Sequence, residues 1–220
     1  MKKSAASPAT QPLNREPRWP AILGLLSVGF LNLAVPERLS LGPRWLILAV
    51  IIILLIPTIF SLRRGMMRLN FFLSTALSTA VTITLIWSLA LLIAGIPDKR
   101  ESPLEMLRGA AALWASNVLV FASWYWRLDA GGPHVRDLRE DHTEGAFLFP
   151  QMTDYRPNAA HEFWKPGFVD YLFLAFNTST AFSPADTPVL SRWAKLLMMT
   201  QSCISLGTIA ILAARAIGAF

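Results

Sequence analysis

The three histidines of the chain lie in one hydrophilic segment, residues 127–165, and could bind a metal ion. The same segment carries seven of the 14 acidic residues, so His134, His142, His161 and Asp141 form a candidate ligand set. Helical metal ligands usually sit three or four residues apart. His134 and His142 are eight residues apart, and His161 is distant from both. The spacing favours a solvated, charged loop, and it predicts no metal, no cofactor and no enzymatic activity.

A second set of polar side chains lies within apolar segments near the C-terminus. Gln201, Ser205, Thr208 and Arg215 recur at helical spacing and share one helix face, and Asp170 and Asn177 share another. Polar groups at membrane depth usually face the bundle interior or a water-filled path. Hydrogen bonding between helices is the favoured interpretation. The alternative is a permeation path, with lining candidates Asp170, Asn177, Thr178, Thr180, Asp186, Gln201, Ser205 and Thr208.

The elements that must position these side chains are predicted to be transmembrane helices. The chain is 54% hydrophobic and only 15% charged, with a mean hydropathy of +0.45. A helix crossing the hydrocarbon core needs about 20 mostly apolar residues. Five charge-free stretches approach or meet this length, and tryptophans stand at their ends. These stretches are residues 19–35, 45–62, 69–96, 109–126 and 196–214.

A shorter apolar stretch precedes the last predicted span. It begins at Lys165-Pro166-Gly167 and continues to about residue 182, where Ser183 and two prolines break the helix. Its roughly 16 residues give about 24 Å, too short to cross comfortably. We therefore predict an all-α fold: a polytopic membrane helical bundle of five transmembrane helices plus one short re-entrant or half-length helix. The parts are a flexible basic tail (1–18), a four-helix region (19–126), a polar acidic loop (127–165) and a C-terminal module (166–220).

The C-terminal quarter resembles the pore module of two-transmembrane-type potassium channels. The residues that carry this resemblance are the run from Asp170 to Thr180, the later Asp186, and the helix end 213–218. The whole layout resembles a group of uncharacterised bacterial multi-pass membrane proteins. The resemblance implies one pore helix per chain, so a pore would need several copies. The filter sequence differs: Thr180-Ala181-Phe182-Ser183-Pro184-Ala185 has neither of the filter's glycines, so potassium selectivity is not predicted.

The distribution of basic residues predicts the orientation. Lys2, Lys3, Arg15 and Arg18 precede the first span, and Arg63, Arg64 and Arg68 join the second to the third. The positive-inside rule places both groups in the cytoplasm, and with them the N-terminus. The acidic loop then lies on the same side, whereas a potassium-channel pore loop enters from outside. Three alternatives reconcile the two: the module is inverted, residues 167–182 cross fully as a sixth span, or the channel resemblance is superficial. We expect location in the bacterial cytoplasmic (inner) membrane.

Two functions follow as expectations. The first is an ion channel-like or permeation protein, acting as a homo-oligomer without a potassium-selective filter. The second is a structural or accessory membrane protein whose acidic loop docks a partner. The net charge of +6 comes from short basic clusters at the ends of apolar runs, a pattern typical of membrane orientation and not of nucleic-acid binding. The lipid bilayer is therefore the expected partner, and the single Cys203 is interpreted as a packing residue.

Overall fold

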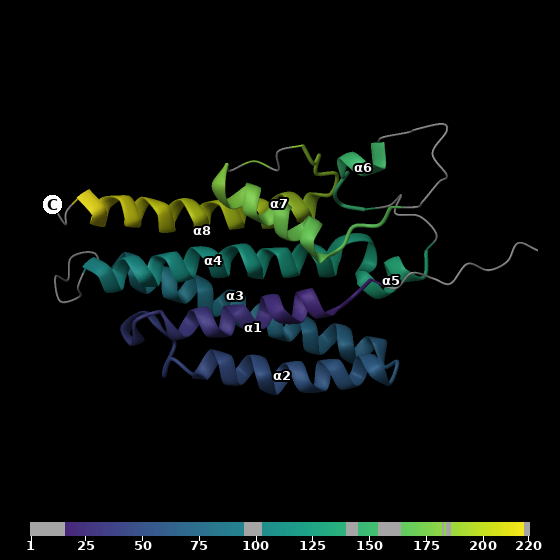
Figure 1. The fold of residues 1–220 in the computed structure, drawn as a ribbon, viewed down its shortest axis with the longest axis horizontal. Coiled ribbons are helices and arrows are strands. Elements are labelled where there is room, and N and C mark those ends of the chain that lie inside the picture. Colours follow the sequence, from purple (N-terminus) through teal and green to yellow (C-terminus); the bar gives the residue numbers. More distant parts are fainter. Residues whose placement is uncertain are drawn as a thin grey trace, which may run out of the picture.

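The protein is a bundle of roughly parallel and antiparallel helices with α4 at its centre (Figure 1). The computed structural model describes residues 16–94, 103–139, 145–153, 164–181, 183 and 186–217. The long elements are α1 (Trp19–Leu33), α2 (Leu46–Arg63), α3 (Met67–Ala94), α4 (Pro103–Leu128) and α8 (Arg192–Ile217). The short ones are η1 (Glu37–Leu39), η2 (Asp129–Gly131), α5 (Pro133–Asp137), α6 (Pro150–Thr153) and α7 (Phe168–Thr180).

Four helices, α2, α3, α4 and α8, are long and apolar enough to cross a membrane. They correspond to four of the five predicted spans. The first predicted span, residues 19–35, forms an apolar α1 of 15 residues, about 22 Å long, which is shorter than the other four. The described elements are all helical apart from one isolated antiparallel bridge between Phe147 and Val189. The coarse prediction of an all-helical bundle with helices long and apolar enough to span a membrane is confirmed.

The central position of α4 follows from its small side chains. In its apolar window 67% of the residues are buried, compared with 22% in α2. Buried Ala110, Ala112 and Ala122 let neighbouring backbones approach, as small residues do in membrane helix packing. Consequently α4 contacts α1 and α3 on one side and α7 and α8 on the other. Helix α2 lies farther out, against α1 and α3 (Figure 1).

Helix α1 runs antiparallel along α4. At one end, the Arg18 guanidinium lies 5.7 Å from the centroid of the Trp126 ring. At the other end, a Cβ added to Gly109 of α4 would lie 2.9 Å from Pro36 Cδ, just after α1. The segment from residue 18 to residue 36 therefore covers the same length of the bundle as residues 109–126 of α4, although α1 itself is short.

The outer faces of the helices are strongly apolar. Ile53 and Ile56 of α2 are 67% and 64% exposed, and Phe72 of α3 is 69% exposed. A water-facing surface would not carry such a continuous set of large apolar side chains. Trp19 and Trp45 are exposed at helix starts, as the interfacial prediction requires. Trp126, also expected at a boundary, is buried, and its indole N–H donates to a carboxylate oxygen of Glu16.

The sequence Ala130-Gly131-Gly132-Pro133 predicts the end of the fourth helix, and α4 ends at Leu128 just before it. Ala130, Gly131 and Gly132 all have positive φ, and a Cβ on Gly132 would lie 2.7 Å from the carbonyl oxygen of Arg127. Only glycine fits at residue 132, because both the backbone angle and the space exclude a side chain. The sequence from Val135 to Glu144 also predicts one short surface helix. In the structure α5 ends at Asp137, and residues 140–144 lie outside the described residues.

Helix α7 and the chain after it form a hairpin. At its start, Tyr171 of α7 donates to Asp129, which follows α4. After the hairpin, Leu190 N–H donates to the carbonyl of Ala146, whose own N–H donates to Asp129. Both ends of the segment therefore lie at the same end of the bundle, beside the C-terminus of α4. The chain enters, turns after Thr180 and returns to where it started (Figure 1).

Candidate functional site

The turn of the hairpin is held by hydrogen bonds from three helices, which we call the polar network: Asn117 and Tyr125 of α4, Ser179 of α7, and Gln201 and Ser205 of α8. All five side chains are buried. Gln201 is the hub. Its Nε2 donates to the carbonyl of Ala175 at 2.7 Å and to Ser179 Oγ at 2.8 Å, and its Oε1 accepts from the Tyr125 hydroxyl at 2.5 Å.

The remaining members extend the network along α7. Ser205 Oγ donates to the backbone carbonyl of Ser179 at 2.6 Å. Asn117 Nδ2 lies 3.4 Å from Ser179 Oγ and 3.2 Å from the backbone carbonyl of Gln201. Ser179 is thus fixed by both α4 and α8. Because Asn117 lies near the middle of α4, the network holds the C-terminal end of α7 near the middle of the bundle.

The other residues predicted to line a path differ in their burial and hydrogen bonds. Buried Thr178 and Thr208 donate to carbonyls of their own helices, those of Leu174 and Ile204. Asn177 is half-buried, and Thr180 and Asp186 are exposed. Gln201 and Ser205 therefore form hydrogen bonds between helices in the packed interior, whereas the buried Thr208 bonds only within α8 among the described contacts. The side chain of Arg215 lies outside the described residues.

Asp170 lies at the first turn of α7, away from the polar network. Its Oδ2 accepts the N–H of Gly167 at 2.7 Å, which satisfies a free donor at the start of the helix. Burial raises the pKa of this carboxyl, and the hydrogen bond from Gly167 opposes that rise. The geometry gives Asp170 a capping role.

A second group of contacts anchors the start of the hairpin, and we call it the charged cluster: Glu16, Arg18, Asp129, Arg136 and Asp137. Asp129 is fully buried and accepts from the Tyr171 hydroxyl at 2.6 Å and from Ala146 N–H at 2.5 Å. Burial is the main cause of a Tyr171 pKa well above its ordinary value, so the hydroxyl remains a donor.

Arginines complete the charged cluster. Buried Arg136 donates to the carbonyls of Trp126 and Asp129 at 2.7 and 2.9 Å, and its Nη2 lies 3.1 Å from a Glu16 carboxylate oxygen. Arg18 pairs with Asp137 at 2.5 Å. The cluster joins the chain before α1 to α4, α5 and α7. Sequence reasoning assigned residues 1–18 to a flexible tail and missed this group, because its members are far apart along the chain.

The acidic loop contributes two buried residues to the charged cluster. Of its seven acidic residues, Asp129 and Asp137 are buried in the charged cluster, and the other five lie outside the described residues. His134 is described, whereas Asp141, His142 and His161 are not. Within the described ranges, no three His, Cys, Asp or Glu side chains lie close enough to hold a metal ion.

Comparison with known proteins gives no match: no protein-family model, curated protein or solved structure is similar to this chain. The interpretation of the site therefore depends on its own geometry.

Proposed function

We propose that the chain is an integral membrane protein with five spans and a re-entrant α7. Four helices are long and apolar enough to cross. The fifth crossing is α1 with its flanking residues, because residues 18–36 lie beside residues 109–126 of α4 over their whole length. A segment that runs the length of a spanning helix occupies the same depth of the bilayer.

The positive-inside rule assigns the orientation in this proposal. Leu62 at the end of α2 and Met67 and Arg68 at the start of α3 line a cavity together with Arg127 at the end of α4. The connection between α2 and α3 and the end of α4 therefore lie at the same end of the bundle as Arg18. We assign this arginine-rich end to the cytoplasm of a bacterial inner membrane. The hairpin then enters from the cytoplasmic side, opposite to the pore loop of a potassium channel.

The observation that carries the functional proposal is the exposed turn of the hairpin. Ser179 is held at the middle of the bundle, and the next described residues, Thr180, Ala181 and Ser183, are exposed. The chain that leaves α7 at this depth is not helical, so its exposed backbone does not form the hydrogen bonds of a continuous helix. Irregular backbone does not face lipid in the hydrocarbon region, because each unsatisfied group costs several kcal/mol. The turn must therefore face water or another protein surface.

We propose that copies of the chain assemble so that their hairpin turns face a shared aqueous path, making the protein a permeation protein. Thr180 and Asp186, both exposed, would line that path. Gln201, Ser205, Thr178 and Thr208 would hold the hairpin in place without contacting the permeant. The alternative is an accessory protein that docks a partner through its acidic loop. It has less support, because Asp129 and Asp137 of that loop are buried in the charged cluster and are not open to a partner.

Cross-linking tests the assembly. In a Cys203→Ser background, Thr180→Cys should form disulfide-linked oligomers in native membranes on mild oxidation, because the turns meet. Ile53→Cys, on the exposed face of α2, is the matched control and should remain monomeric. Only monomers for Thr180→Cys, or equal linking for both variants, would contradict the proposal.

Flux measurements test the path itself. Reconstituted protein should conduct small cations such as K⁺ and Na⁺ in liposomes, and Asp186→Asn should reduce that flux several-fold, since it removes a charge from the path. Glu37→Gln, an exposed acid at the opposite end of the bundle, should leave the flux unchanged. Absence of cation flux in oligomeric protein would support the docking alternative.

A further inference from the structure

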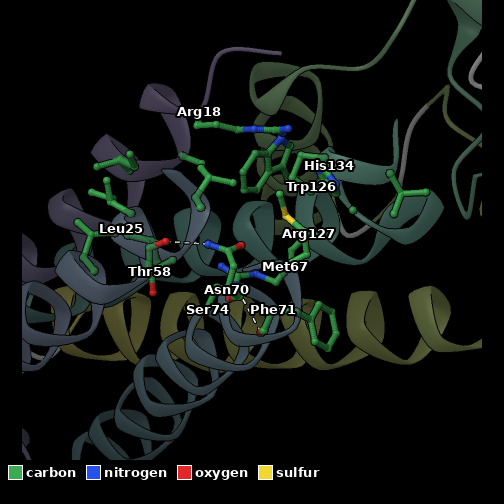
Figure 2. Close-up of a pocket in the computed structure, with 18 of the residues that line it drawn as sticks. Arg18, Leu25, Thr58, Met67, Asn70, Phe71, Ser74, Trp126, Arg127 and His134 are labelled. Atoms are coloured by element: carbon green, nitrogen blue, oxygen red, sulfur yellow. Dashed lines mark hydrogen bonds between the residues drawn. The ribbon is translucent and has the colours of Figure 1, made fainter. Parts of the chain in front are cut away.

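A cavity of about 410 Å³ lies at the arginine-rich end of the bundle, separate from the hairpin (Figure 2). Its walls come from α1, α2, α3 and the end of α4 with the turn into α5. The volume lies in the range of small-molecule sites. Arg68 and Phe71 line it and are exposed, so the mouth of the cavity lies at the start of α3.

The ionisable side chains that line the cavity are all basic. Arg18, Arg68, Arg127 and His134 line it, and no aspartate or glutamate does. Arg18 is paired with Asp137. Arg127 differs: the residue is 7% exposed, and its Nε and Nη1 are buried without a hydrogen-bond partner among the described residues. A buried guanidinium is stabilised by an anionic partner, so Arg127 is positioned to pair with the anionic group of a ligand.

The rest of the cavity wall is mostly apolar. Leu25, Leu55 and Ile59 line it beside Phe71, and the few neutral polar groups include Asn70, whose amide donates to the carbonyl of Thr58 at 2.8 Å (Figure 2). A free inorganic anion would pair with Arg127 but would leave the apolar wall of the cavity in contact with water. A ligand with an anionic head and an apolar tail satisfies both parts.

We propose that the cavity binds the head-group region of an anionic phospholipid from the surrounding leaflet. The phosphate pairs with Arg127, Arg68 contacts the head group at the mouth, and the first part of an acyl chain lies along Leu25, Leu55 and Ile59. Basic pockets between transmembrane helices on the cytoplasmic side are where anionic lipid head groups bind. This inference depends on the membrane location and is independent of whether the protein conducts ions.

Native mass spectrometry of the full chain tests the proposal. Protein released from nanodiscs containing equal amounts of phosphatidylglycerol and phosphatidylcholine should retain phosphatidylglycerol preferentially. Arg127→Met should reduce that retention about tenfold or more, the worth of a buried charge-assisted pair. Arg63→Gln removes an exposed arginine at the same end, outside the cavity, and should change little. Equal retention in the Arg127 and Arg63 variants would overturn the proposal.

Stability measurements separate the ligand sources and control for folding. Phosphatidylglycerol should raise the melting temperature of the wild-type protein in neutral detergent, whereas inorganic phosphate and oleate should do so weakly. Stabilisation by inorganic phosphate alone, or by oleate alone, would overturn the phospholipid assignment. Arg127→Met should melt no lower than the lipid-free wild type, because it removes an unpaired buried charge. Ile59→Trp, which keeps every charge and fills the apolar part, should also lose phosphatidylglycerol; retention would contradict the proposed pose.

Discussion

Replacement of Asp129 by alanine is expected to lower the free energy of unfolding by about 3–5 kcal/mol, the cost of breaking a buried charged network. Asp129 is fully buried and joins three parts of the chain. Its loss removes the acceptors for the Tyr171 hydroxyl and the Ala146 N–H, and it leaves Arg136 with less compensating negative charge. Unfolding in mixed micelles with increasing sodium dodecyl sulfate, followed by circular dichroism, measures the change.

Two variants control this prediction. Asp186→Ala removes an exposed aspartate from the same module and should change the free energy of unfolding by less than about 0.5 kcal/mol. Tyr171→Phe removes one of the hydrogen bonds of Asp129 and keeps the ring, so its effect should be about 1 kcal/mol. An Asp129→Ala protein as stable as Asp186→Ala would show that the charged cluster does not anchor the hairpin.

The second large effect is expected at Gln201. Gln201→Leu keeps the volume roughly constant and removes hydrogen bonds to Ala175, Ser179 and Tyr125, all within the packed interior. Hydrogen bonds between helices in membranes contribute about 0.6 kcal/mol on average, with a maximum near 1.7, so three together predict a loss of about 2 kcal/mol. The same detergent titration measures it.

The matched control is the neighbouring Thr200. Its hydroxyl is exposed and donates only to the carbonyl of Leu196 in its own helix. Thr200→Val should therefore leave the free energy of unfolding within about 0.5 kcal/mol of the wild type. If Gln201→Leu were equally mild, the polar network would contribute little to positioning α7.

The helices that are long and apolar enough to span a membrane could be predicted because their signal is local. Charge-free runs such as residues 45–62 and 69–96 are long enough to predict a crossing directly. The short length of the apolar stretch before Ser183 likewise predicted a half-length helix, and α7 has 13 residues. The same reasoning predicted a span over residues 19–35, but α1 has only 15 residues and reaches the length of the bundle only with its flanking turns.

Part of the candidate site could also be predicted, because its signal is local in the sequence. Gln201, Ser205 and Thr208 share a helix face at a spacing visible in the sequence. Their partners on α4 and α7 are separated from them by as many as 84 residues, so only packing reveals the pairs. The charged cluster was missed because Glu16 lies 120 residues from Arg136. The role of Asp170 differs from the pore-lining hypothesis, since its carboxylate accepts a backbone N–H at the start of its own helix.

The most direct test of the re-entrant hairpin is the side of the membrane on which its two ends lie. Leu138, before α7, and Leu190, after it, are 64% and 58% exposed, so a cysteine at either position is open to a membrane-impermeant maleimide. In a Cys203→Ser background, Leu138→Cys and Leu190→Cys should both be labelled from the cytoplasmic face. Leu41→Cys, between α1 and α2, should be labelled from the opposite face. Labelling of Leu138→Cys and Leu190→Cys from opposite faces would show that α7 crosses the membrane completely.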